Sequence, residues 1–187
     1  MTSELALRLV VCPPERLVEM FRLRSAVWIG EGADPAAFPG GEWRDEKDAS
    51  RRHWIVLDAD RVVATASLSM HGSFADVEEG DVYLRAGLSS PGPIAAPARV
   101  TVASEYRGRG LAQALLDAQD AAALEAGAAL SVRQASPSMR RLLERRGWQE
   151  HGPGPWDVRF PGVQFTVMSL PGPGRPDRAG NPAPGRR

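Results

Sequence analysis

The segment Arg99–Leu116, with the sequence RVTVASEYRGRGLAQALL, joins β-branched residues to two closely spaced glycines and then to strong helix formers. It predicts a strand over Arg99–Ala103, a turn containing Gly108 and Gly110, and a helix over roughly Leu111–Ala126. The first turn of a helix exposes unpaired N–H groups at the positive end of the helix dipole, and glycines let a phosphate approach the backbone closely. These residues therefore predict a binding site for a diphosphate group.

The spacing of the residues in this turn decides which diphosphate motif it resembles. The dinucleotide fingerprint G-x-G-x-x-G/A would need Gly or Ala at Gln113, and no segment matches the P-loop pattern G-x-x-x-x-G-K-[ST]. With a strand before it and a helix after it, the turn instead resembles the coenzyme A (CoA) motif of the GNAT superfamily of N-acetyltransferases. An ordinary glycine-rich turn is the alternative. The motif pattern [QR]-x-x-G-x-[GA] fits Arg107, Gly108, Arg109, Gly110, Leu111 and Ala112.

A second segment adds to the resemblance. Ser136–Trp148, SPSMRRLLERRGW, is similar to the family's Asn-x-x-Ala-x-x-Leu-Tyr-x-x-x-Gly-Phe segment and matches it at Leu142, Gly147 and Trp148. The resemblance implies an α/β (α+β) fold with a single mixed, mostly antiparallel central sheet of about six or seven strands, flanked by about four helices. This domain would span residues 1–170, followed by a disordered Pro/Gly/Arg-rich tail over 171–187.

Hydrophobic patterns predict the remaining elements of this fold. Two segments rich in Gly and Pro, 30–52 and Ser89–Pro97, are typical of loops. We expect strands over Ala6–Val11, His53–Asp58, Arg61–Met70, Val82–Leu84, Leu130–Arg133 and Val163–Leu170, and helices over Glu15–Trp28 and Pro137–Arg146.

The resemblance implies that acetyl-CoA is the co-substrate. In this family the motif strand leaves backbone groups free for the pantetheine arm, and an N–H near Val102 would face the thioester carbonyl. The diphosphate would bind the N–H groups of the turn, where Arg107 and Arg109 add positive charge. The cofactor-binding residues implied are Val100, Thr101, Val102, Arg107, Gly108, Arg109, Gly110, Leu111, Ala112 and Ser136.

The usual reaction of the family is direct attack of a neutral amine on the thioester. An amine with a pKa near 10.4 is mostly protonated at neutral pH, so a general base should line the amine site. The run Arg24-x-x-x-Trp28, Glu42, Trp43, Asp45, Asp48 and His53 resembles a GNAT branch that is also similar to autoinducer synthases. It makes Trp28 and Trp43 candidate substrate-binding residues. The candidate catalytic residues are Glu42, Asp45, Asp48 and His53. The same residues could equally form a solvated loop and a packed strand.

The sequence departs from the family at two positions. The frequent Tyr acid maps to Leu143, which cannot donate a proton, and the Asn at the start of the second segment maps to Ser136. These departures keep a non-catalytic, CoA-binding GNAT module open as an alternative. A second alternative is an N-acyl-homoserine-lactone synthase that uses acyl-carrier protein and S-adenosylmethionine. Arg24 and the acidic run favour that alternative, and the intact CoA-type turn disfavours it.

The amino-acid composition limits the kinds of partner that we expect the protein to bind. The 187 residues carry 23 basic and 23 acidic side chains, a neutral balance that argues against a dedicated nucleic-acid binder. One cysteine and three scattered histidines predict neither an internal disulfide nor a metal site. No signal peptide or membrane-length apolar run is evident, so we expect a cytoplasmic protein without a membrane partner. The expected partner is a small-molecule amine, and a homodimer stays possible.

Overall fold

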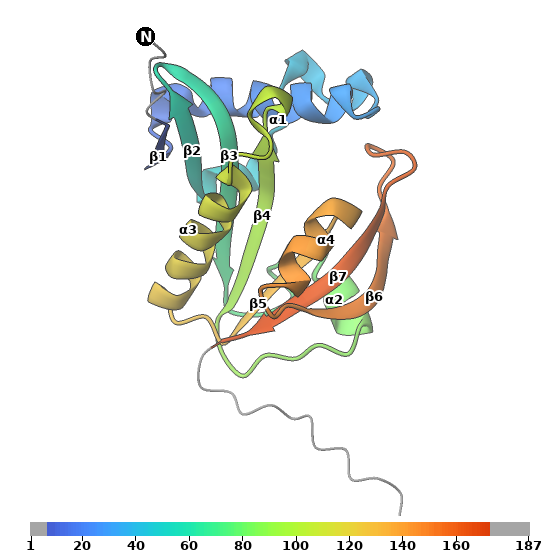
Figure 1. Ribbon diagram of the computed structural model, residues 1–187. Coiled ribbons are helices and arrows are strands. Elements are labelled where there is room, and N and C mark those ends of the chain that lie inside the picture. Colours follow the sequence, from blue (N-terminus) through green and yellow to red (C-terminus); the bar gives the residue numbers. More distant parts are fainter. Residues whose placement is uncertain (1–6, 173–187) are drawn as a thin grey trace, which may run out of the picture.

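The computed structural model of the chain describes residues 7–172 (Figure 1). The helices are α1 Leu17–Gly30, α2 Gly80–Arg85, α3 Leu111–Glu125 and α4 Pro137–Glu144. The strands are β1 Arg8–Val11, β2 Arg52–Asp58, β3 Arg61–His71, β4 Ile94–Val102, β5 Leu130–Ala135, β6 Gln149–Trp156 and β7 Gln164–Pro171.

The described strands form one seven-stranded sheet in the order β1-β2-β3-β4-β5-β7-β6. Neighbouring strands run antiparallel except for β4 and β5, which are parallel. This arrangement confirms the expected mixed, mostly antiparallel sheet. The predicted tail lies outside the described residues from position 173 onward, as does Ala6 of the first predicted strand.

The strands β4 and β5 diverge along their length. They pair at Ile94 with Leu130 and at Ala95 with Ser131, and no further pair follows. In Figure 1 the two strands start together and separate into a V, with α4 lying in front of the opening. Beyond Ala95, one edge of β4 is therefore free of its parallel neighbour, which leaves room for a ligand between the strands.

The helices α1 and α3 pack on the strands that form the β4 arm of this V. On one side, Leu111 and Leu115 of α3 are buried against Trp54 and Val63 of the sheet. Near β1 and β2, α1 contributes Met20 and Phe21 to a second apolar cluster. Each such buried side chain contributes roughly 1.5–3 kcal/mol. The packing holds the start of α3 and the end of α1 at the open end of the V.

Three sequence predictions were wrong in detail. Val82–Leu84 belongs to α2 rather than to a strand, because its apolar residues pack on Ile94 and Leu130 from a single helical turn. The strand β4 begins at Ile94, inside the predicted loop Ser89–Pro97. The strand β6, with the sequence QEHGPGPW, was not predicted because its Pro and Gly residues are typical of loops. It is an edge strand with an irregular register, where such residues are tolerated.

Candidate functional site

A cleft of about 510 Å³ lies between β4, the start of α3 and the first half of α4. It brings together almost the whole set of residues that the sequence predicted to bind the cofactor. The exception is Arg109, whose guanidinium lies 5.0 Å from the centre of the Tyr106 ring. The predicted residues that line the cleft are Val100, Thr101, Val102, Arg107, Gly108, Gly110, Leu111, Ala112 and Ser136.

The glycine turn at the end of this cleft is open. Gly108 and Gly110 have φ values of 76° and 78°, a left-handed conformation that L side chains rarely adopt. A Cβ at either position would meet nothing within 4 Å, so an added side chain would occupy space that a ligand could use. In the described chain, the N–H groups of residues 108–113 have no hydrogen-bond acceptor. Unpaired donors at the start of α3 fit the diphosphate of CoA.

A free donor also lies along β4. The N–H of Ala103 donates to the carbonyl of Val63 on β3, at 2.9 Å. Because amide directions alternate along a strand, the N–H of Val102 points the opposite way, toward the opening of the V. No strand pairs with Val102 on that side, because β5 has already diverged. The resemblance implies a donor near Val102 that faces a thioester carbonyl, and that role remains a prediction.

One contact crosses the mouth of the cleft. The guanidinium of Arg107 forms an ion pair with Glu31, which follows α1, and both residues line the cleft. Both side chains are substantially exposed. The predicted phosphate-binding charge of Arg107 is therefore already matched by a carboxylate.

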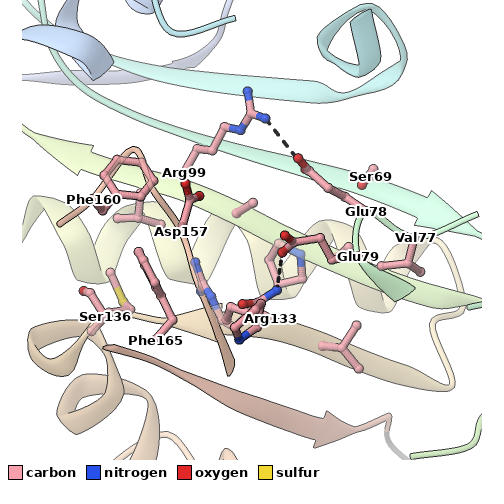
Figure 2. A pocket seen from close by; sticks show the side chains of 18 of the residues that line it. Ser69, Val77, Glu78, Glu79, Arg99, Arg133, Ser136, Asp157, Phe160 and Phe165 are labelled. Carbon is pink, nitrogen blue, oxygen red and sulfur yellow. Dashed lines mark hydrogen bonds and ion pairs between the residues drawn. The ribbon is translucent and has the colours of Figure 1, made fainter. Parts of the chain in front are cut away.

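A second, smaller cavity of about 170 Å³ adjoins the first (Figure 2). The two cavities share Trp28, Val100, Ser136 and Met139 in their walls. Aromatic rings form one side of the second cavity, with ring centres between 4.4 and 6.3 Å from Trp28. The rings are Trp28 and Trp43, which the sequence predicted, and Phe160 and Phe165, which it did not.

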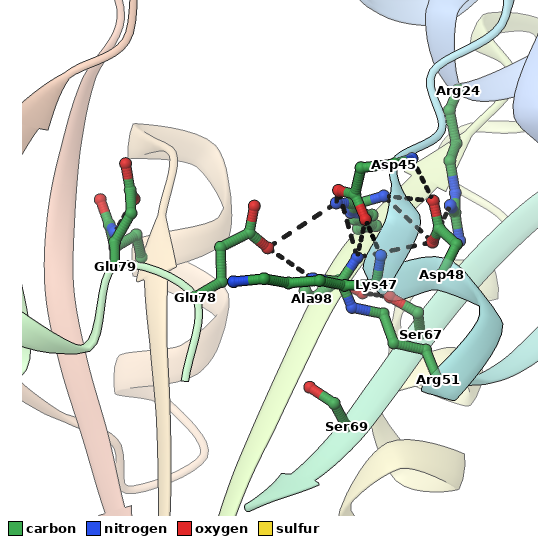
Figure 3. A network of polar contacts seen from close by, with 12 residues as sticks. Arg24, Asp45, Lys47, Asp48, Arg51, Ser67, Ser69, Glu78, Glu79 and Ala98 are labelled. Atoms are coloured by element: carbon green, nitrogen blue, oxygen red, sulfur yellow. Dashed lines mark hydrogen bonds and ion pairs between the residues drawn. The ribbon is translucent and has the colours of Figure 1, made fainter. Parts of the chain in front are cut away.

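The predicted catalytic carboxylates Asp45 and Asp48 lie beside this cavity in a network of ion pairs (Figure 3). Asp48 is 4% exposed and contacts Arg24 at 3.1 Å and Arg99 at 2.9 Å. Asp45 pairs with the same Arg99. Burial alone would raise the pKa of Asp45, but the hydrogen bond and charge of Arg99 lower it overall.

Two further residues complete the network. Arg51 contacts Asp45 and Asp48 and lies 2.5 Å from Glu78, which also approaches Arg99 at 3.7 Å. Three arginines therefore face three carboxylates, and the formal charges cancel. The acidic run identified in the sequence does not present free negative charge to a ligand.

His53 is enclosed behind the same network. Its Nδ1 lies 3.1 Å from a guanidinium nitrogen of Arg24, and its Nε2 lies 2.9 Å from the carbonyl oxygen of Asp48. Arginine can only donate, so Nδ1 accepts and the Nε2–H donates, which is the neutral form. Burial lowers the pKa of His53, against the opposing hydrogen bond to Asp48.

Of the four predicted catalytic residues, none lines either cavity. Glu42, the fourth, pairs with Arg22 and Arg44 at 3.5 Å each. Their predicted role in proton transfer remains a prediction.

The guanidinium of Arg99 explains a backbone irregularity in β4. Thr101 faces Thr65 and Ala98 faces Ser67, so Arg99 and Val100 together oppose only Ala66. Arg99 has a φ of 58°, which costs a non-glycine residue roughly 1–2 kcal/mol. Its buried contacts with Asp45 and Asp48 offset this cost. The bulge lies two residues before Val102, with Thr101 between them, so a change at Arg99 would act on the free N–H through the register of β4. No sequence motif identifies Arg99 as a residue of the site.

Glu79 is a second residue that sequence reasoning missed. It lines the smaller cavity and has a φ of 53°, another left-handed non-glycine conformation. Its carboxylate accepts a hydrogen bond from Gln134 at 2.6 Å and stands apart from the network (Figure 3). Glu78 and Asp157, the other carboxylates of the cavity wall, are paired with arginines. Among residues 7–172, Glu79 forms no ion pair.

The helix α4 provides a hydroxyl where the cavities meet. Ser136 precedes α4 and lines both cavities, and its Oγ lies 3.3 Å from that of Ser138. Leu143, at the position of the family's tyrosine, is fully buried with Leu116 and Trp148. It lines neither cavity, so no side chain at this position could reach a ligand without repacking.

Comparison with known proteins identifies the family. Residues 17–148 match the model of the acetyltransferase (GNAT) family. The chain belongs to the GNAT family. It is therefore an acyltransferase with the GNAT fold. None of the curated protein sequences matches it significantly.

Solved GNAT-fold structures are similar to this member of the family over most of their length. An N-acyl amino acid synthase from uncultured soil microbes, FeeM, is 16% identical, with a TM-score of 0.66 and coverage of 90% of this chain and 91% of its own. The AHL synthase LasI is 14% identical, with a TM-score of 0.67 and coverage of 88% and 89%. Arylalkylamine N-acetyltransferase 2 from Aedes aegypti is 11% identical, with a TM-score of 0.65 and coverage of 89% and 99%. At these identities the likeness concerns the fold.

Within residues 7–172, no group of three or more His, Cys, Asp or Glu side chains is arranged to hold a metal ion. No helix in this range combines the length and apolar character needed to cross a membrane.

Proposed function

We propose that this GNAT enzyme transfers an acetyl group from acetyl-CoA to the primary amine of a small molecule. The observation that carries the proposal is the meeting of two cavities at Val100 and Ser136. One cavity ends in the unpaired N–H groups of residues 108–113, and the other is lined by aromatic rings and by Glu79. A donor site and an acceptor site that meet are what acyl transfer requires.

Different residues of the chain bind different parts of acetyl-CoA. The turn at Gly108 and Gly110 holds the diphosphate, and the free edge of β4 holds the pantetheine arm. When bound, acetyl-CoA supplies an activated acetyl thioester. The N–H of Val102 stabilises negative charge on the carbonyl oxygen during attack, a contribution of about 3–4 kcal/mol in other acyl-transfer enzymes.

Glu79 is the base that the geometry favours. A general base needs a free lone pair within reach of the amine. Glu79 lines the acceptor cavity without a cationic partner, whereas Asp45 and Asp48 are held by arginines and both nitrogens of His53 are engaged. We therefore favour Glu79 as the base and assign Asp45 and Asp48 the positioning of β4.

Ser136 takes the role of the missing tyrosine. Its hydroxyl is a protic group at the junction of the two cavities, whereas Leu143 is buried in the core. We propose that Ser136 donates a hydrogen bond to the leaving thiolate, which solvent then protonates.

A second candidate function is acyl transfer from a longer or carrier-bound acyl donor. The observation in its favour is that Arg24, Asp45 and Asp48, which the sequence shares in pattern with autoinducer synthases, lie in one network. Turnover rates for acyl-CoA donors with chains of roughly two to twelve carbons distinguish the two candidate functions.

The test is release of free thiol from acetyl-CoA in the presence of a panel of primary amines. We expect turnover by the wild type and a loss of about 10²–10⁴-fold in kcat for Glu79→Gln. We also expect Glu79→Gln to bind acetyl-CoA as tightly as the wild type, because Glu79 does not line the donor cleft. Turnover of long-chain donors alone would support the second candidate, and full activity of Glu79→Gln would exclude Glu79 as the base.

A further inference from the structure

Arg133 of β5 is a buried cation that forms no ion pair with the described residues, and the charge of Asp120 acts on it only from beyond ion-pair distance. Arg133 belongs to the wall of the acceptor cavity (Figure 2) and is 5% exposed. Its Nε and Nη1 atoms are enclosed and have no hydrogen-bond partner. Within the described part of the chain it forms no ion pair, and its contact of note is the Trp148 ring, 5.8 Å from the guanidinium carbon.

This isolation is energetically unfavourable. Burying a charge without a partner costs several kcal/mol even after the surroundings relax. Burial lowers the pKa of Arg133 to about 10, so the side chain is still a cation at neutral pH. No hydrogen bond to its third nitrogen, Nη2, occurs among the described residues, and Nη2 is not among the enclosed atoms. This nitrogen is the one left to contact the cavity.

The charges of the cavity wall define the kind of ligand it suits. Glu78 is matched by Arg51 and Arg99, and Asp157 by Arg159. In the wall of this cavity, one carboxylate, Glu79, and one guanidinium, Arg133, then have no ion-pair partner among residues 7–172. A polyamine would satisfy only the first of these groups. A molecule that carries both an amine and a carboxylate would satisfy both.

We infer that the acceptor is an amino acid, whose carboxylate binds Arg133 while its amine faces Glu79. The rings of Trp28, Trp43, Phe160 and Phe165 contact its side chain. The inference rests on the proposed function, because it assumes that the smaller cavity holds the acceptor. It narrows the acceptor from amines in general to amines that carry a carboxylate.

Equilibrium binding tests this assignment without turnover. Calorimetric titration reports binding to the cavity, and the probes are L-leucine, L-phenylalanine, L-tryptophan and L-serine, each beside its primary amide. In the wild type saturated with CoA, we expect at least one acid to bind about 10- to 100-fold more tightly than its amide, as a hydrogen-bonded charge pair would produce. In Arg133→Gln the acid and the amide should bind equally.

The acid–amide comparison separates recognition from general damage. A damaged protein loses affinity for both probes, whereas loss of a carboxylate contact removes the preference alone. The matched control is Arg140→Gln, an exposed arginine of α4 that lines neither cavity and should keep the wild-type preference. The melting temperature of Arg133→Gln should not fall, because the variant removes a buried charge that has no partner.

Three results would overturn the inference. One is the absence of any acid–amide preference in the wild type, and another is the same preference in Arg133→Gln. The third is a lower KM for succinyl-CoA than for acetyl-CoA that depends on Arg133, which would assign the guanidinium to a carboxylate of the donor. The proposed function would survive all three if simple amines without a carboxylate are still acetylated, and it fails separately if acetyl-CoA does not bind.

Discussion

The bulge in β4 allows a test of how the ion-pair network serves catalysis. Replacing Arg99 by alanine removes contacts to the buried Asp48, and breaking a buried pair costs about 3–5 kcal/mol. The alanine must also keep a φ of 58° at a cost of roughly 1–2 kcal/mol, or relax and shift the register of β4 through Thr101 to Val102. Glycine loses the same ion pairs but adopts the left-handed conformation freely.

The two substitutions should therefore differ. We expect Arg99→Gly to be more stable than Arg99→Ala by about 1 kcal/mol in the free energy of unfolding. If Arg99→Ala turns the N–H of Val102 away from the thioester, kcat should fall by about 10²–10³-fold, and Arg99→Gly should recover much of that loss. Urea titrations measure the stability, and thiol release measures kcat.

A control variant isolates the backbone effect. Arg24→Met also removes a guanidinium from Asp48, but Arg24 is fully buried on α1 and touches neither cavity. It should lose stability of the same order while keeping kcat within a few-fold. Equal kcat values for Arg99→Gly and Arg99→Ala would refute the argument that the conformation of the bulge is what Arg99 contributes.

Three further predictions concern other contacts. Glu31→Gln frees Arg107 for the diphosphate and should tighten acetyl-CoA binding up to about five-fold at low salt, because an exposed ion pair contributes about 0.2–1 kcal/mol. Calorimetry measures the Kd, and an unchanged Kd would show that the ion pair does not affect binding. His53 has a pKa lowered by burial, so it contributes stability that is present above the unfolded pKa near 6.5 and lost as pH falls through the folded value. Urea midpoints should thus decline on acidification below pH 6.5 less steeply in His53→Gln than in the wild type, and parallel curves would contradict this. Ser136→Ala should lower kcat about ten-fold with little change in the Kd of acetyl-CoA, whereas a loss confined to Kd would make Ser136 a binding residue.

The donor cleft was predictable from sequence because its elements are local. The strand, the glycine turn and α3 follow one another, so one segment specifies both the N–H groups and the conformations that expose them. Arg109 was predicted to line the cleft but lies against the ring of Tyr106 instead. The direction of an arginine side chain depends on its rotamer, which a sequence pattern does not encode.

The acceptor cavity was less predictable because distant segments assemble it. Asp45 and Asp48 were identified as chemically significant, but Arg99, one of the two arginines that contact both of them, lies on the distant strand β4. Only the folded sheet reveals that their charges are neutralised. Glu79 and Arg133 belong to no sequence motif. They were identified because they form no ion pair with the described residues, and only the folded structure shows this.

Calorimetric titration of the full chain with acetyl-CoA shows whether the glycine turn binds this molecule. The comparison variant is Gly110→Trp, in which a bulky side chain must fill the open space beside the free N–H groups. We predict micromolar binding by the wild type at a stoichiometry near one, weakened by at least about ten-fold in the variant. The melting temperature of the variant should fall by only a few degrees, because tryptophan must adopt the left-handed conformation of Gly110. Absence of binding by the wild type, or equal binding by Gly110→Trp, would contradict the account.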